Sequence, residues 1–249
     1  MIGRTLLVTG TDTGVGKTLV SAAIAAALGA RGARVAVAKP IETGCALVAG
    51  TRYPEDAVTL AAAAATTDPL EVVCPYRFAD PLAPMLAAAR EGTTIDVATL
   101  LGTLAARAAA ADVLLIEGAG GLLVPLTATT TYADVARALD ASVLLVVGSR
   151  LGAINHARLS LEALAARGLC VVGYVVNRLA PDGDPAAETN AALLRSLTSV
   201  RCLGELPRLA DASATLRALR DGTGAAAARG RLAALARAHL DLDALDAAR

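Results

Sequence analysis

Apolar residues occur along the chain in short unbroken runs rich in valine, isoleucine and leucine, each bounded by glycine, proline or a charged residue. Six of these runs cover residues 5–9, 34–38, 113–116, 143–147, 171–176 and, with a weaker pattern, 202–206. Apolar residues that do not alternate with polar ones are typical of strands buried on both faces of a parallel sheet. The pattern therefore predicts a strand at each run.

Segments rich in alanine and leucine, with apolar residues at helical spacing, separate these runs. They cover residues 17–31, 55–65, 95–110, 153–167 and 185–198. Alternation of strands with helices predicts an α/β fold, with a doubly wound and mostly parallel sheet flanked by helices, as in P-loop NTPases.

Two parts of the chain depart from this alternation. Residues 68–92 are rich in proline, which predicts an ordered loop with short turns that serves as a lid or wall. Residues 224–249 form an Ala/Arg/Leu tail, for which we expect a single helix or a helix pair packing on the sheet edge. We find no internal repeat or linker, so we expect a single domain over residues 1–249.

Composition narrows the class of protein. Hydrophobic residues make up 55% of the chain and aromatic residues only 2%, so valine, leucine, isoleucine and alanine must build the core. The chain has 23 Lys plus Arg and 23 Asp plus Glu, so its formal net charge is zero and nothing in it indicates the basic surface of a nucleic-acid-binding protein. The four cysteines form no C-x-x-C pair, which argues against a zinc ribbon or a disulfide framework. The longest helix-like apolar stretch, residues 19–30, is shorter than the roughly 18 residues of a membrane span. We expect a cytoplasmic protein that binds neither nucleic acid nor membrane.

The segment from Gly10 to Thr18, GTDTGVGKT, lies between the first predicted strand and the first predicted helix, which is the context of a phosphate-binding P-loop. Glycines let backbone N–H groups curl around phosphate oxygens, and the helix N-terminus adds partial positive charge. Lys17 is expected to reach the β- and γ-phosphates of ATP, and the Thr18 hydroxyl to bind Mg²⁺. Thr11 occupies the position of the first glycine in the common pattern, so the loop is a longer variant.

Charged residues follow predicted strands at the carboxyl edge of the sheet, where ligands of open α/β sheets bind. Lys39 ends the second strand, Glu117 ends the third strong strand, and Asp56 stands near the start of a later helix. An acidic residue at the end of a buried strand needs a partner, which for Glu117 is either Mg²⁺ or a salt bridge. Asp56 is either a second magnesium ligand or a favourable charge at a helix N-terminus.

Taken in order, these motifs resemble the dethiobiotin synthase family over about residues 5–211. The long P-loop follows the family form G-T-x-T-x-V-G-K-T, so its length is a family trait. The family elements that follow in order are K-P-x-x-[ST]-G from Lys39, P-Y-x-F-x-x-P-x-x-P from Pro75, E-G-A-G-G from Glu117, L-G-x-[IL]-N-H from Leu151 and G-E-[IL]-P from Gly204.

This resemblance implies an ATP- and Mg²⁺-dependent carboxylation and ring closure of 7,8-diaminononanoate. One amine takes up CO₂, supplied by bicarbonate, to form a carbamate, whose oxygen attacks the γ-phosphate of ATP to give a carbamic–phosphoric anhydride. The second amine then closes the cyclic urea of dethiobiotin, with release of phosphate and ADP. The resemblance also implies a homodimer with substrate bound near the subunit interface.

The resemblance further assigns roles to residues. Lys17 and Lys39 are the expected catalytic residues, which neutralise the carbamate and the γ-phosphate, while Thr18, Asp56 and Glu117 are expected to hold Mg²⁺. Residues expected at the nucleotide, with Asn177 at the adenine edge, are Gly14, Val15, Gly16, Lys17, Thr18, Leu19, Asp56, Glu117, Gly118, Ala119, Gly120, Asn177, Arg178, Leu206, Pro207, Arg208 and Asp211. Residues expected at the substrate are Thr13, Thr43, Gly120, Gly152 and Asn155. By hypothesis, the neighbouring subunit supplies Gly152 and Asn155.

Two other classes of protein share a P-loop of this kind. Switch ATPases of the partitioning or cell-division type resemble the chain in fold, but many carry a lysine five residues before Lys17, where Asp12 stands here. They also lack the K-P-x-x-[ST]-G element. Amidating synthases of the cobyrinate type need a glutaminase domain with a nucleophilic cysteine, for which 249 residues leave no room. A carboxylase acting on another diamine is the remaining alternative.

Overall fold

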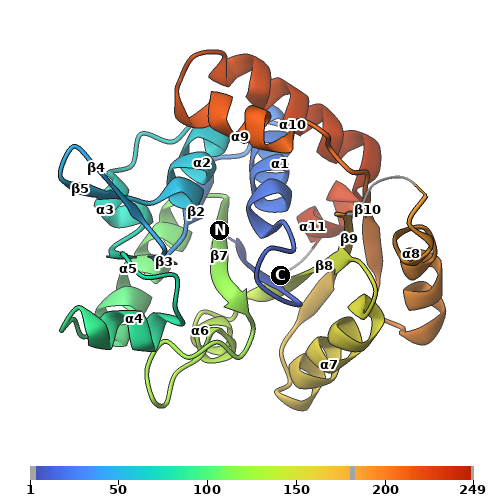
Figure 1. The fold of residues 1–249 in the computed structure, drawn as a ribbon, viewed down its shortest axis with the longest axis horizontal. Helices are drawn as coiled ribbons and strands as arrows, with labels where there is room; N and C mark the ends of the chain where they lie inside the picture. Colours follow the sequence, from blue (N-terminus) through green and yellow to red (C-terminus); the bar gives the residue numbers. More distant parts are fainter. Residues whose placement is uncertain (1–3, 180–182, 248–249) are drawn as a thin grey trace.

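The computed structural model of the protein describes residues 4–179 and 183–247, and a six-stranded parallel sheet runs through this part of the chain (Figure 1). The strand order is β10-β9-β8-β1-β7-β2. The strands are β1 (Arg4–Gly10), β2 (Val35–Ala38), β7 (Val113–Gly121), β8 (Ser142–Ser149), β9 (Val171–Arg178) and β10 (Cys202–Leu206). The predicted strands and the parallel α/β sheet are thereby confirmed.

The apolar runs form strands because most of their side chains are buried on both faces of the sheet. Every residue of β8 is buried, and so is all of β1 beyond its first residue. β7 differs from the prediction, because it continues past Ile116 as far as Gly121. Pairing with β1 resumes between Gly10 and Gly121 after an irregularity in register, so Glu117 lies within the strand rather than at its end.

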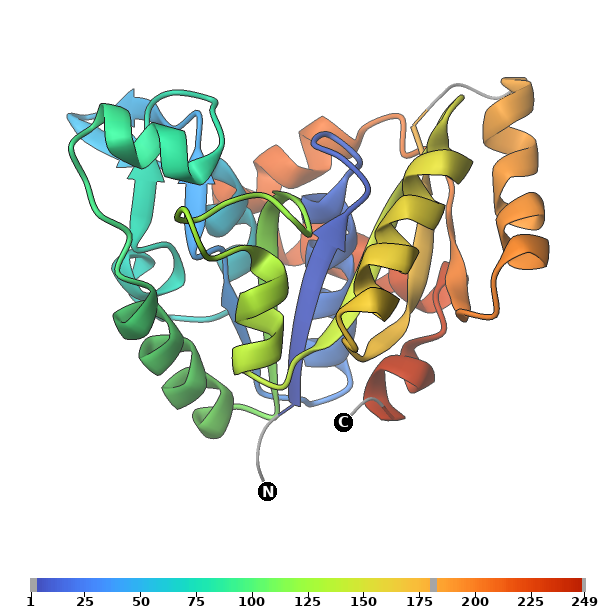
Figure 2. The same cartoon turned by 90° about the horizontal axis from the view of Figure 1, so that it is seen from below.

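Helices cover both faces of the sheet, as Figure 2 shows. On one face lie α1 (Lys17–Ala30) and α2 (Glu55–Ala64), whose buried side chains share one core cluster with Leu6 and Val8. The helices on the other face are α5 (Val97–Ala110), α6 (Tyr132–Ala138), α7 (Ala153–Ala166) and α8 (Pro185–Leu197). The short α6 was not predicted from the sequence.

The segment between α2 and α5 is more regular than its prolines suggest. It contains α3 (Leu70–Val73), β6 (Tyr76–Phe78) and α4 (Pro84–Arg90). The prediction of a loop with turns was therefore wrong for much of residues 68–92. The reason is that Pro69 and Pro84 stand at helix N-termini, where the missing N–H of proline costs nothing.

Three short strands precede this segment along the chain. β3 (Ile41–Thr43) pairs in parallel with β6, which ties the residues after Lys39 to the proline-rich region. β4 (Ala46–Val48) and β5 (Thr51–Tyr53) form an antiparallel hairpin before α2.

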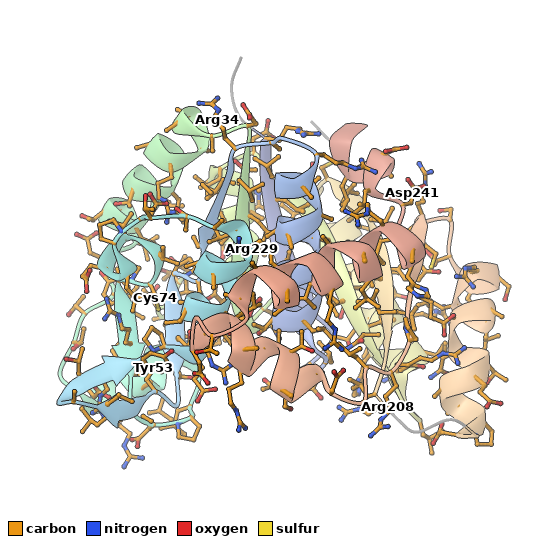
Figure 3. The ribbon with its side chains drawn as sticks, turned by 90° about the horizontal axis from the view of Figure 1, so that it is seen from above. Arg34, Tyr53, Cys74, Arg208, Arg229 and Asp241 are labelled. Atoms are coloured by element: carbon orange, nitrogen blue, oxygen red, sulfur yellow. The ribbon has the colours of Figure 1, made fainter. Side chains whose placement is uncertain are left out.

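The chain closes with α9 (Ala212–Arg220), α10 (Ala225–His239) and α11 (Leu242–Ala247). Figure 3 shows α10 crossing over α1, with Arg229 labelled near α2, and the Arg229 Nε donates to the carbonyl of Ala62 at 2.9 Å. α10 packs mainly on α1, and Leu240, the residue that follows α10, forms a bridge with Gly204 of the edge strand β10. The predicted packing on the sheet edge was therefore wrong for most of the helix, and residues 248 and 249 of the predicted tail lie outside the described residues.

Across residues 4–179 and 183–247, no helix combines the length and the apolar character needed to cross a membrane.

Candidate active site

A cavity of about 740 Å³ opens at the carboxyl edge of the sheet, where the P-loop follows β1. Its lining joins segments far apart in the sequence: the P-loop, the ends of β2, β7 and β9, residues 81–84, and α9. Sequence-predicted residues that line it are Thr13, Gly14, Gly16, Lys17, Thr18, Leu19, Lys39, Thr43, Asp56, Glu117, Ala119, Gly120, Asn177, Arg178 and Arg208.

The P-loop bends through two glycines in the left-handed region. Gly14 has φ 74° and Gly16 has φ 86°, and Gly16 immediately precedes α1. Lys17 is buried, and its Nζ donates to the carbonyl of Asp12 at 3.1 Å. Asp12 in turn pairs with Arg150 at 2.7 Å, which holds the outer part of the loop against the end of β8. These contacts hold the loop against the neighbouring end of β8.

The side-chain amide of Asn177 contacts the backbone of the P-loop. Its Nδ2 donates to the carbonyl of Val15 at 2.9 Å, and the amide lies against Gly16, where an added Cβ would stand 2.1 Å from Nδ2. Only a glycine fits between Asn177 and the start of α1. Asn177 thus has a structural contact in addition to its place in the cavity wall.

Gly16→Ala should weaken ADP binding by at least roughly tenfold. The alanine would be strained by its left-handed backbone conformation, and its Cβ would also clash with the Asn177 amide. The matched control is Gly14→Ala, which carries similar φ strain but meets no atom within 4 Å of its new Cβ. Isothermal titration calorimetry of both variants with ADP measures the difference. Equal losses in the two variants would contradict the proposed close contact.

Lys39, Asp56 and Glu117 form a charged cluster beside the P-loop. The Lys39 Nζ lies 2.6 Å from Glu117 Oε1 and 2.8 Å from Asp56 Oδ2, and the Thr18 hydroxyl donates to Glu117 Oε1 at 2.9 Å. Burial opposes the charge on Lys39, but the carboxylates of Glu117 and Asp56 outweigh burial and hold the pKa of Lys39 well above its ordinary value. Burial likewise opposes ionisation of Asp56, yet Lys39 lowers the pKa of Asp56.

The oxygens of this cluster suit a divalent cation. Glu117 is fully buried, and its Oε2 has no hydrogen-bond partner among the described residues. No group of three or more His, Cys, Asp or Glu side chains gathers as a metal site in the same part of the chain. Two carboxylates and a threonine hydroxyl nevertheless match the sparse protein ligation of Mg²⁺ at nucleotide sites, where phosphates and water complete the coordination.

Lys17 is the second buried ammonium of the site. Burial, followed by the nearby charge of Lys39, lowers the pKa of Lys17 to about 8. Near pH 8, roughly half of the free protein molecules therefore carry a neutral Lys17.

Binding of ADP should take up protons near pH 8, because phosphate oxygens favour the charged form of Lys17 and raise its pKa. The affinity for ADP should fall as the pH rises from 7 to 9. Calorimetry in buffers of different ionisation enthalpy measures the uptake, which Lys17→Met should abolish. Proton release at pH 8, or uptake that survives in Lys17→Met, would contradict the assignment.

Several sequence-predicted residues lie outside this cavity wall. Leu206 is a core residue, and Gly118 packs on the ring of Tyr132. Asp211 pairs with Arg231, which lowers the pKa of Asp211 through a hydrogen bond. Other predicted residues absent from the wall are Val15 and Pro207.

Gly152 and Asn155 line a second cavity of about 800 Å³ between α7 and α8. The chain by itself does not bring these two predicted substrate residues together with Thr13 and Thr43.

The sequence reasoning missed part of the cavity wall. Glu42, buried on β3, was not singled out, although it stands inside the K-P-x-x-[ST]-G element. Ala212, Ser213 and Leu216 of α9 also line the cavity and belong to a helix that was not predicted. Pro81 to Pro84 form a wall, as the length of the proline-rich segment suggested.

Comparisons with known proteins give a matching family model and relatives of high identity. A family model described as an AAA domain matches residues 4–215. An ATP-dependent dethiobiotin synthetase BioD from Anaeromyxobacter dehalogenans (strain 2CP-C) is 46% identical over 216 residues, which cover 87% of this chain and 95% of the relative. A protein of the same name from Xanthomonas oryzae pv. oryzae (strain PXO99A) is 42% identical, over 85% of this chain and 94% of its own.

Solved structures share the fold at low sequence identity. The septum site-determining protein MinD from Pyrococcus horikoshii OT3, complexed with Mg-ADP, superposes with a TM-score of 0.53 at 15% identity, over 93% of this chain and 95% of its own. A ParA family ATPase from Chlorobium tepidum TLS superposes with a TM-score of 0.57 at 13% identity, over 97% and 98% of the two chains. These likenesses confirm a fold of the P-loop NTPase type.

Proposed function

We infer from the membership of this chain in the ATP-dependent dethiobiotin synthetase family that its cavity carboxylates 7,8-diaminononanoate with CO₂ and closes the cyclic urea of dethiobiotin. The chain is an ATP-dependent ligase of biotin biosynthesis. One observation carries the assignment of the site: two buried lysines, Lys17 and Lys39, lie in the wall of one cavity with the P-loop. Two anions, a carbamate and a γ-phosphate, need such a pair of charges to approach each other.

The P-loop supplies the phosphate site in this proposal. The N-terminus of α1 and the glycine-rich backbone from Gly14 to Gly16 bind phosphate oxygens of ATP. Lys17 is already buried beside this backbone and provides the positive charge. The nucleoside would bind at the end of the cavity that is lined by Asn177 and Arg178, at the end of β9, and by Arg208.

Thr18, Asp56 and Glu117 would hold Mg²⁺ when it is bound, and the ion would polarise the phosphate oxygens and offset their charge. The ammonium of Lys39 bridges the carboxylates of Asp56 and Glu117. A cation that takes these oxygens would weaken the attraction of Lys39 for them, which leaves Lys39 available to an anionic substrate. The place of the buried Lys39 ammonium in the cavity wall, beside the P-loop, supports Lys39 as a catalytic residue.

The chemistry then needs positioning more than acid–base groups. A substrate amine adds to CO₂ and gives the carbamate with loss of a proton. The carbamate oxygen attacks the γ-phosphorus, and the bond to ADP breaks. The second amine attacks the carbonyl carbon, and phosphate leaves as the ring closes with loss of a second proton. Thr13, Thr43 and the amide at Gly120 line the cavity where the carbamate would lie.

The substrate carboxylate is proposed to bind a second copy of the chain. Gly152 and Asn155 line the cavity between α7 and α8, and Leu151, Leu159 and Leu193 around it are 90%, 57% and 48% exposed. An apolar face of this kind is suited to a protein interface. We propose a homodimer in which the start of α7 completes the site of the partner.

Leu159→Asp should convert the dimer to a monomer and raise the KM for the diamine, because the start of α7 would no longer reach the partner's site. Sedimentation velocity and steady-state kinetics measure the two effects. Leu47→Asp, at an exposed leucine on the β4–β5 hairpin, is the matched control. A Leu159→Asp protein that stays dimeric with an unchanged KM would rule out this face as the interface.

We also propose that residues 1–249 form one domain in the cytoplasm. The two apolar clusters of the core share one sheet, which supports a single folding unit. ATP is the co-substrate, which supports a cytoplasmic reaction.

The test of the proposed function is phosphate release from MgATP with bicarbonate, with and without 7,8-diaminononanoate, together with mass spectrometry of the product. Release that depends on the diamine, with a product that carries one added carbonyl, is the expected result. Release that is indifferent to the diamine would instead indicate a switch ATPase.

A further inference from the structure

The first turn of the helix α2 is capped by a side chain from the strand β3. Pro54 stands at the N-cap position and has no side-chain acceptor of its own. The side chain of Glu42, which lies on β3 fourteen residues before Asp56, supplies two acceptor oxygens instead. Its Oε1 accepts from the Asp56 N–H at 2.9 Å and its Oε2 from the Ala57 N–H at 3.0 Å. Glu42 is only 7% exposed, so this buried carboxylate is committed to the helix start.

Asp56 is therefore held twice by one short segment. Lys39 contacts its carboxylate at 2.8 Å, whereas Glu42 contacts its backbone N–H. A metal ion that binds the Asp56 carboxylate competes with Lys39 but not with Glu42. The Glu42 contact can thus persist while Lys39 changes partners, and it fixes the position of the Asp56 backbone in both situations.

We infer that Glu42 is a positioning residue for the divalent cation, which it serves by anchoring the first turn of α2 so that Asp56 faces Thr18 and Glu117. The inference rests on the proposed function, in which Asp56 is a metal ligand. Glu42 does not touch the metal or the substrate in this assignment. Residues behind metal ligands usually affect metal affinity by roughly ten- to a hundredfold.

The test uses Mn²⁺ as a probe of the metal site in the full-length protein with ADP, with free Mn²⁺ measured by electron paramagnetic resonance. Glu42→Ala should weaken Mn²⁺ affinity by roughly tenfold, while ADP affinity without metal stays unchanged. Glu42→Gln keeps one carbonyl acceptor but sets an NH₂ group against the other backbone N–H, so its affinity should fall by less. The half-saturating Mg²⁺ concentration for turnover should rise in parallel, with the KM for the diamine unchanged.

Asp96→Ala is the matched control, because Asp96 caps α5 by accepting from the Thr99 N–H at 3.0 Å, in a helix that does not line the cavity. It should leave Mn²⁺ affinity unchanged. Equal losses in Asp96→Ala and Glu42→Ala would overturn the inference by showing general loosening of the fold. Unchanged Mn²⁺ affinity in Glu42→Gln overturns it as well, and this variant carries the test if Glu42→Ala does not fold.

Asp56→Asn separates the inference from the proposed function. It should lose more Mn²⁺ affinity than either Glu42 variant, because it changes the ligand itself. Loss in Asp56→Asn with none in the Glu42 variants overturns the positioning role alone. No loss in Asp56→Asn overturns the proposed ligand set, and the inference with it.

Discussion

Lys39→Met should lower turnover by roughly a hundredfold or more and also lower the free energy of unfolding by about 3–5 kcal/mol. The loss of turnover follows from the loss of a charge donor at the reacting anions. The loss of stability follows from the Glu117 carboxylate, which is fully buried and lies 2.6 Å from the Lys39 Nζ. Removing the ammonium leaves that charge buried with no positive partner in contact with it.

A second substitution separates the two effects. The double variant Lys39→Met/Glu117→Gln should recover most of the stability but none of the turnover. The fully buried carboxylate is then replaced by a neutral amide, and the Asp56 carboxylate that also loses Lys39 is 40% exposed. Urea unfolding of the metal-free proteins measures the stability. Arg34→Met is the matched control, because the Arg34–Asp112 pair is exposed and solvent screens its charges, so its loss should change the stability little. Equal unfolding free energies of Lys39→Met and Arg34→Met would show that the buried Lys39–Glu117 pair does not stabilise the fold as predicted.

Lys17→Met should also lower turnover by roughly a hundredfold or more, but without loss of stability. Burial lowers the pKa of Lys17 to about 8, below its ordinary 10.5, so at neutral pH the folded protein must hold a charge that the site disfavours. Among the described residues, no carboxylate lies within ion-pair distance of its Nζ, whose contact is the carbonyl of Asp12. Replacing the ammonium with an apolar group of similar length should therefore leave the unfolding free energy unchanged or raise it.

The same urea experiment at pH 7 compares the two lysine variants directly. The destabilising effect of Lys17 is fully present below pH 8 and fades as the pH rises from about 8 towards 10.5, so any gain in Lys17→Met should shrink over that range. A loss of stability in Lys17→Met as large as that in Lys39→Met would contradict the different roles given to the two ammonium groups.

The central strands could be predicted because burial on both faces leaves an unbroken apolar run, as in residues 143–147 of β8. The P-loop could be predicted because its glycines and lysine stand at fixed spacing in one short segment. The far end of β7 could not, because residues 117–121 are an acid, glycines and an alanine, and only pairing with β1 makes them a strand. Whether such a segment forms a strand depends on the neighbouring strand as much as on its own sequence.

The site was predictable only where its residues belong to motifs. Lys39, Asp56 and Glu117 were each named from the sequence. Their meeting at 2.6–2.8 Å depends on the end of β2, the start of α2 and the later half of β7 lying at one edge of the sheet. Glu42 was missed because an acid in a short strand after a lysine carries no local sign of what it caps. Its partners, the backbone amides of α2, have no sequence signature at all.

The place of the start of α7 relative to the substrate could not be predicted from a single chain. Gly152 and Asn155 were assigned to the substrate, yet they line a cavity separate from the one that holds Thr13 and Thr43. Sequence order does not reveal which surfaces meet between copies of a chain. The proposed dimer accounts for both the separate cavity and its exposed leucines.

The central claim is that a carbamate oxygen attacks the γ-phosphate of ATP, and a single-turnover reaction with freshly dissolved C¹⁸O₂ tests it most directly. The proposed reaction places one labelled oxygen in the released phosphate and the other in the carbonyl of the cyclic urea, both measurable by mass spectrometry. Label in the urea but none in the phosphate would show that phosphate forms by hydrolysis of ATP, and would contradict the mechanism proposed for this site.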